Sequence, residues 1–149
     1  MTQTAAGARH EPTVAAPAPT CWPALKADDA PALIDFLVDV VGFRRTAVYT
    51  DADGARSWVA HAQLDWPEGG GVLMGSRRPT SGVAPGIAGR CVVTDHVDEV
   101  HDRVRDAPGV TITHQLTDTD HGNHEFVMTD PEGNYWSFGT YRGDAPDPA

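Results

Sequence analysis

The sequence predicts an α+β fold in which two tandem βαβββ modules form one cupped mixed sheet with helices outside. The first observation is a hairpin pattern from His124 to Gly139, in which an Asp-Pro-Glu-Gly-Asn turn joins two strands of aromatic and β-branched residues. Secondly, residues 67–69 repeat the Pro-Glu-Gly of residues 131–133 at an offset of 64 positions. Thirdly, an upstream match at an offset of 67 places Asp28 on Asp95. These offsets indicate a duplicated unit of roughly 55–65 residues.

In the first unit, we expect residues 20–27 to form a strand. Asp28 or Asp29 should cap a helix with Pro31 in its first turn, and Gly42 should end it. The apolar residues of this helix follow a helical period: Leu33, Ile34, Leu37, Val38 and Val41. Three further strands are predicted at residues 43–49, 57–64 and 71–76, with a turn at residues 51–54.

The second unit repeats this order. A strand is expected at residues 90–94, and Asp95 should cap a helix that ends near Pro108. The buried stripe of this helix is Val97, Val100 and Val104. A strand at residues 110–116 and a polar loop at residues 117–123 lead into the final hairpin.

These elements predict a single domain of residues 19–142. Module one covers about residues 20–77, the Gly- and Pro-containing linker residues 78–88, and module two about residues 89–141. Residues 1–18 and 143–149 lack apolar periodicity and are expected to be flexible tails.

Composition excludes several classes of function. Asp and Glu number 21 against 11 Lys and Arg, and the net charge of −10 argues against nucleic-acid binding. No apolar run approaches the roughly 18 residues of a membrane span, and the N-terminus lacks the apolar core of a signal peptide. Cys21 and Cys91 have no metal-site spacing. We therefore expect a cytoplasmic protein with no membrane or nucleic-acid partner.

The two modules, ending in Asp-Pro-Glu-Gly-Asn-Tyr-Trp-Ser-Phe-Gly-Thr-Tyr at residues 130–141, resemble the vicinal oxygen chelate superfamily. Within it, the chain is similar to glyoxalase/bleomycin-resistance-like proteins, and residues 27–32, 61–64, 75–76 and 118–126 also fit. The similarity covers about residues 20–141. Members of this superfamily are isomerases, thiol transferases, ring-cleaving dioxygenases or non-catalytic drug-binding proteins, so the resemblance implies the fold but leaves the activity open.

The metalloenzymes of this superfamily take their ligands from the first and last strand of each module. Carried over, these positions are Cys21 and Ala88 on the first strands, and Leu73 and Ser137 on the last strands. A divalent metal needs three or four His, carboxylate or thiolate donors. One thiol and one hydroxyl do not supply them, so we expect no metal and no cofactor. The alternative is a divalent ion such as Zn, Ni, Mn or Fe, for instance in a different site that uses His61.

Strand alternation places His61, Gln63 and Glu125 towards the cup, with Val59 on the same face as His61. His61 and Glu125 are candidate catalytic residues because both can move protons near neutral pH. Hydrogen bonding among neighbouring side chains is the alternative role. Further candidates for ligand contact complete an apolar, aromatic pocket: Leu73, Arg90, Tyr135, Ser137, Trp22 and Trp58.

Arg90 is also a candidate partner for a substrate carboxylate or for Glu125. Trp136 and Phe138 are expected to pack in the core on the helix side of the sheet. Cys21 and Cys91 should face opposite sides of the sheet, which argues against a disulfide between them.

Two function hypotheses follow. The first is a metal-independent small-molecule-binding protein that sequesters an aromatic or cationic antibiotic, which the acidic chain and cup aromatics suit. The second is a glyoxalase-type lyase or isomerase, or a dioxygenase, acting with a divalent metal on a small oxygenated substrate. A role in association with another protein also stays open. An unpaired module edge favours a homodimer, and exchange of the N-terminal strand is one way to form it.

Overall fold

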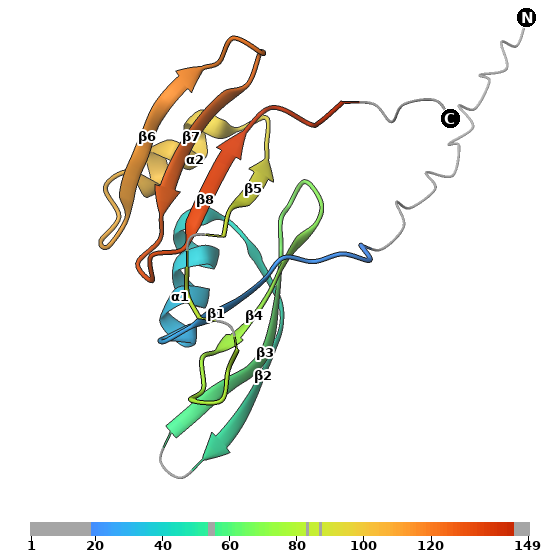
Figure 1. The fold of residues 1–149 in the computed structure, drawn as a ribbon, viewed down its shortest axis with the longest axis vertical. Helices are drawn as coiled ribbons and strands as arrows, with labels where there is room; N and C mark the ends of the chain where they lie inside the picture. The colour runs from blue at the N-terminus through green and yellow to red at the C-terminus, as the bar shows by residue number, and fades with distance from the viewer. Residues whose placement is uncertain (1–18, 54–55, 83, 87, 145–149) are drawn as a thin grey trace, which may run out of the picture.

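A computed structural model describes residues 19–53, 56–82, 84–86 and 88–144. The expected tail at residues 1–18, residues 145–149 of the expected tail at residues 143–149, and Gly54 of the expected turn lie outside the described residues. The α+β fold is confirmed: strands form two four-stranded mixed sheets, each with a helix segment against it. Figure 1 shows module two, in yellow to red, beside module one, in blue to green. No described helix is long and apolar enough to cross a membrane.

Each sheet has the same strand order. The first is ordered β1-β4-β3-β2 and the second β5-β8-β7-β6. In each, the first strand of the module is parallel to the last, and the other pairs are antiparallel. The strands are β1 (Ala24–Ala27), β2 (Arg44–Asp53), β3 (Arg56–Asp65), β4 (Gly71–Ser76), β5 (Arg90–Val93), β6 (Thr111–Asp118), β7 (His124–Thr129) and β8 (Tyr135–Gly139).

The helix of module one begins and ends as its sequence predicts. In α1 (Ala30–Phe36), the Asp29 side chain accepts a hydrogen bond from the Ala32 amide at 3.2 Å. A π-helical turn, η1 (Leu37–Val41), continues it to Gly42. Gly42 has a φ of 112°, a conformation that residues with a Cβ rarely adopt.

The helix of module two, α2 (Val97–Val104), buries the predicted stripe of Val97, Val100 and Val104. The predicted cap at Asp95 is wrong. The capping position is His96, whose side chain makes no capping hydrogen bond. The helix ends at Val104, before the predicted end near Pro108.

An aromatic cluster joins the two modules. Phe43 of module one meets Trp136 of module two with ring centroids 5.7 Å apart, and Trp66 meets Phe138 at 6.2 Å. Trp136 and Phe138 are fully buried, as predicted. Edge-on and tilted aromatic pairs at these distances are attractive beyond their apolar area. The modules therefore pack against each other through their helix-side faces.

Two glutamates connect each module to the helix start of the other. Glu132, in the β7–β8 turn, accepts hydrogen bonds from the amides of Asp28 and Asp29 at 2.9 and 2.6 Å. Glu68, in the β3–β4 turn, accepts one from the Asp95 amide at 3.2 Å and one from the Thr94 hydroxyl. A carboxylate is favoured at a helix start because the amides there have no partner within the helix.

These contacts also affect the titration of Glu68. Burial raises the pKa of its carboxyl, but the Thr94 hydroxyl and Asp95 amide outweigh burial, and the pKa lies below its ordinary value. The charged form is therefore favoured in the folded protein. Its stabilisation is present above the ordinary carboxyl pKa and is lost as pH falls through the lowered one.

We predict that Glu68→Gln and Glu132→Gln each lower the free energy of unfolding by about 1–3 kcal/mol, because a charged hydrogen-bond acceptor is lost. Urea unfolding at neutral pH measures this. The matched control is Glu99→Gln on α2, since Glu99 is exposed and its side-chain polar contact among the described residues is with the His96 ring. Losses no larger than that of the control would contradict this role.

Candidate functional site

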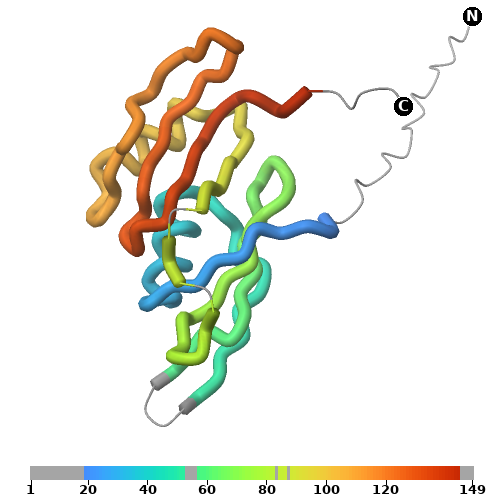
Figure 2. Tube along the Cα trace, in the orientation of Figure 1, coloured from blue at the N-terminus to red at the C-terminus, as the bar shows by residue number. Residues whose placement is uncertain are grey.

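The cup face of module one follows from strand register. Gln63 pairs with Leu73, and Leu73 pairs with Ala24. Paired residues point to the same side of a sheet, so these three share a face, which we call the cup face of module one. Trp22 lies beside it, with its indole against Gly71, where an added Cβ would come within 2.9 Å of the ring. Figure 2 shows this N-terminal segment, in blue, crossing the green β3–β4 turn.

The other predicted residues of module one lie further out. His61 is exposed and stacks on Tyr49 with ring centroids 6.2 Å apart. Trp58 lies under the Arg78 guanidinium, 5.6 Å from the ring centre, beside a separate hollow. The expected orientation of Val59 is wrong: the register shifts between Tyr49 and Thr50, and Val59 is only 3% exposed in the core. A bulge of this kind adds one residue and reverses the alternation beyond it.

The cup face of module two is built in the same way. Val127 pairs with Ser137, and Ser137 with Cys91, while Glu125 and Tyr135 lie two residues along their strands from Val127 and Ser137. These five residues define this face. Glu125, Tyr135 and Ser137 therefore have the predicted orientation.

A residue outside the predicted set holds Glu125. The Asn123 side-chain amide donates a hydrogen bond to the Glu125 carboxylate, and its oxygen accepts one from the Tyr141 amide at 2.9 Å. Asn123 is itself buried against Gly139. The sequence could have indicated this contact, because Asn123 lies two residues before Glu125 and side chains two apart on a strand share a face. Glu125 and His61 lie on different sheets with no hydrogen bond or ion pair between them, so they do not act as a pair within one chain.

Arg90 has the opposite orientation to the predicted one. It pairs with Trp136 across β5 and β8, on the helix side of the sheet. Its guanidinium lies 5.6 Å from the centre of the Trp136 ring, and the residue is only 8% exposed. Burial lowers the pKa of this guanidinium, while the Asp130 carboxylate acts in the other direction. Arg90 thus cannot contact Glu125 across the cup face.

Arg90 instead lines a cavity of about 290 Å³ between the two modules. Its walls come from the β3–β4 turn, β5 and the aromatic cluster, and include Phe43, Trp66 and Trp136. Cys21 and Cys91 both line it and are exposed free thiols, with no disulfide between them. Trp22, Gln63, Glu125 and Ser137 do not line this cavity.

Comparison with known proteins decides the family. The family model of the Glyoxalase/Bleomycin resistance protein/Dioxygenase superfamily matches residues 22–138. The chain belongs to this superfamily. TioX from Micromonospora sp. ML1 is similar, with 31% identity and a TM-score of 0.61 over 78% of this chain and 93% of that one. A comparison with curated proteins finds no significant match.

Two less similar structures share the fold. TnmS3, an antibiotic binding protein from Streptomyces sp. CB03234, is 23% identical with a TM-score of 0.55, over 77% of this chain and 88% of that one. A superfamily member from Sphaerobacter thermophilus DSM 20745 is 20% identical with a TM-score of 0.59, over 78% and 91%.

The superfamily includes metalloenzymes, and the cup faces can be tested for a metal. The residues beside Leu73 and Ser137 on the first strands are Ala24 and Cys91, not Cys21 and Ala88 as predicted. Ala24 and Cys91 are separated by the same 67 positions as Cys21 and Ala88, but they lie three residues further along the chain. These four positions still offer one thiol and one hydroxyl, a set that does not fit a divalent ion. Among the described residues, no three His, Cys, Asp or Glu side chains converge to hold a metal.

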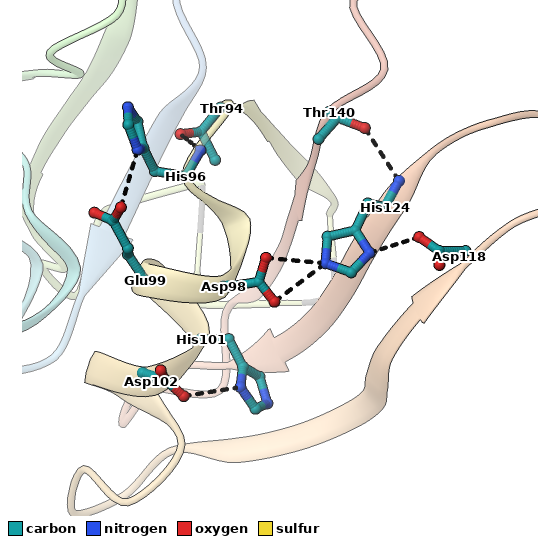
Figure 3. Close-up of polar contacts among 9 residues, drawn as sticks. All are labelled: Thr94, His96, Asp98, Glu99, His101, Asp102, Asp118, His124 and Thr140. Atoms are coloured by element: carbon teal, nitrogen blue, oxygen red, sulfur yellow. Dashed lines mark hydrogen bonds and ion pairs between the residues drawn. The ribbon is translucent and has the colours of Figure 1, made fainter.

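One histidine of this superfamily member does lie between two carboxylates. His124 Nδ1 is 2.7 Å from Asp118 on β6, and its Nε2 is 3.3 Å from Asp98 on α2 (Figure 3). Opposite ring nitrogens are used, so the carboxylates do not converge on one point. The Asp118 and then the Asp98 hydrogen bonds raise the pKa of His124, against a smaller effect of burial. Sequence patterns did not indicate this contact because Asp98 is distant from His124 in the chain.

His124 should make stability depend on pH. Its pKa is raised on folding, so its contribution is complete below the ordinary value of 6.5 and is lost as pH rises through the higher, folded value. We predict that His124→Gln destabilises the protein most at acidic pH and least at alkaline pH, as measured by urea unfolding across this range. His114→Gln, at an exposed position of β6, is the control. An equal effect of His124→Gln at all pH values would contradict the charged contact.

Proposed function

We propose that this chain is a metal-independent small-molecule-binding protein that sequesters an aromatic ligand such as an antibiotic. The observation that carries the proposal is the chemistry of the cup faces. Leu73 and Ala24 stand where a metalloenzyme needs donors, and Trp22 and Tyr135 add aromatic surface beside them. Apolar and aromatic walls with a few polar anchors are typical of small-molecule sites.

The relatives support this proposal. The similarity to TioX extends over 93% of that protein at 31% identity. TnmS3 shows that the same fold serves antibiotic binding in another protein. The acidic chain, with a net charge of −10, suits a neutral or cationic ligand on its outer surfaces.

We further propose that the ligand lies between two copies of the chain. Within one chain the cup faces belong to separate sheets, and the aromatic cluster directs their helix sides, not their cup faces, towards each other. Leu73 and Tyr135 are left half-buried, and His61 is exposed. The short strands β1 and β5 are sheet edges, which a second copy can approach. A homodimer that joins the cup face of module one to that of module two would enclose a site.

We predict that the protein is a dimer in solution, with twice the 15.9 kDa mass of one chain. Light scattering after gel filtration measures it. Leu73→Glu should shift the mass towards 15.9 kDa, because burying a charge in the interface between two copies is costly. Lys26→Glu, at the half-buried position two residues from Ala24, tests whether reversing a charge on this edge has the same effect. A monomeric wild-type protein at high concentration would contradict the dimer.

Metal independence is tested by melting chelator-treated protein with Zn, Ni, Mn and Fe(II). We expect no saturable rise in melting temperature with any of them, and a rise with an aromatic antibiotic from a screened panel. A ligand at about a hundred times its dissociation constant stabilises the folded state by about 2.7 kcal/mol. A metal-induced rise abolished by His61→Ala or Glu125→Ala would instead favour a lyase, isomerase or dioxygenase. The same antibiotic should lose its effect with Leu73→Glu.

A further inference from the structure

The cavity between the modules has a chemistry of its own. It lies beside the edge strand β5, and its wall includes Arg90 and Trp136 of the helix side together with Cys91 of the cup face. More of this wall is apolar than polar. Phe43, Trp66 and Trp136 provide aromatic surface, and Val72 and Val92 aliphatic surface. Its volume of about 290 Å³ is near the lower end of small-molecule pockets, about 300–1,000 Å³, so it suits a ligand of one or two rings.

Arg90 brings a positive charge into this apolar space. The residue is 8% exposed, and its Nη1 donates a hydrogen bond to the Ala88 carbonyl at 2.8 Å. Its Nε–H is buried and has no acceptor among the described residues. A buried donor without an acceptor is costly and is rare in native proteins.

The nearby carboxylates do not satisfy Arg90. Asp130 accepts hydrogen bonds from Asn134, the Glu132 amide and the Trp136 indole. Glu68, at the cavity wall, is held by Thr94 and Asp95. Within the described residues, no carboxylate lies at ion-pair distance from Arg90. Arg142, the other arginine of the wall, is paired with Asp95 at 2.9 Å.

The missing partner of Arg90 is best supplied by a carboxylate. A guanidinium offers a planar fork of N–H groups that matches the two oxygens of a carboxylate. Asp130 and Glu68 and the net charge of −10 oppose a dianion such as phosphate, so a monoanion is favoured. The aromatic walls add a preference for a flat ring beside that group.

We infer that the cavity between the modules binds a small aromatic carboxylate, with Arg90 as its anchor. Leu73, Glu125 and Tyr135 of the proposed antibiotic site do not line this cavity. The inference therefore does not depend on whether the cup faces bind an antibiotic. Trp66 and Trp136 in its wall give an intrinsic fluorescence signal on binding.

The test uses naphthalene-2-carboxylate and its uncharged match, naphthalene-2-carboxamide, titrated into the full chain by calorimetry and tryptophan fluorescence. The wild-type protein should bind the carboxylate about ten to a hundred times more tightly than the carboxamide, as expected for a charged hydrogen-bonded contact. Arg90→Met should remove this preference. Arg90→Lys, which keeps the charge but not the fork, should retain part of it.

Two control variants show whether the preference belongs to this cavity. Arg45→Met removes an exposed arginine paired with Asp35 and should leave the preference unchanged. Leu73→Glu on the cup face should also leave it unchanged, so that a failed cup proposal and a failed cavity proposal are distinguishable. No saturable carboxylate binding by the wild-type protein, equal binding of both probes, or a preference that survives Arg90→Met would overturn the inference. The first two of these outcomes are measured on the wild-type protein, so they do not depend on whether a variant folds.

Discussion

The contact between Phe43 and Trp66 of module one and Trp136 and Phe138 of module two is the interaction on which the rest of the structure depends. Burial of four large rings at one junction removes apolar surface from water, and this stabilises the contact between the modules. The same aromatic contact also fixes how the two modules are oriented relative to each other. Because the helix sides of both sheets are used to join the modules, their cup faces must point outwards, and the gap beside β5 becomes a cavity.

The sequence predicts the fold well because the signals for it are local or repeated. Helix stripes, the Asp-Pro-Glu-Gly-Asn turn and the duplicated spacing all depend on residues close in the chain. The burial of Trp136 and Phe138 follows from simple alternation along β8. The membership of the superfamily follows from the same motif, which the match to residues 22–138 confirms.

The candidate site was harder to predict because the face to which a strand side chain points depends on where the alternation along the strand begins. Strand β5 has four residues, Arg90–Val93, so little in the sequence fixes which of them face the cup. A shift of one residue moves every side chain to the other face, and this is how Arg90 and Cys91 exchange sides. The bulge near Val59 has the same effect within β3. Contacts such as that of His124 with Asp98 join residues whose proximity only the folded chain reveals.

The glutamate contacts between the modules indicate how the two-module chain could have arisen. Glu68 reaches the helix start of module two, and Glu132 reaches that of module one, at equivalent places in the repeat. An interface in which each half gives the same group to the same place on the other is the form of a two-fold symmetric dimer. The single chain thus keeps the geometry of two identical half-length subunits, as expected if a gene for one βαβββ unit was duplicated and fused.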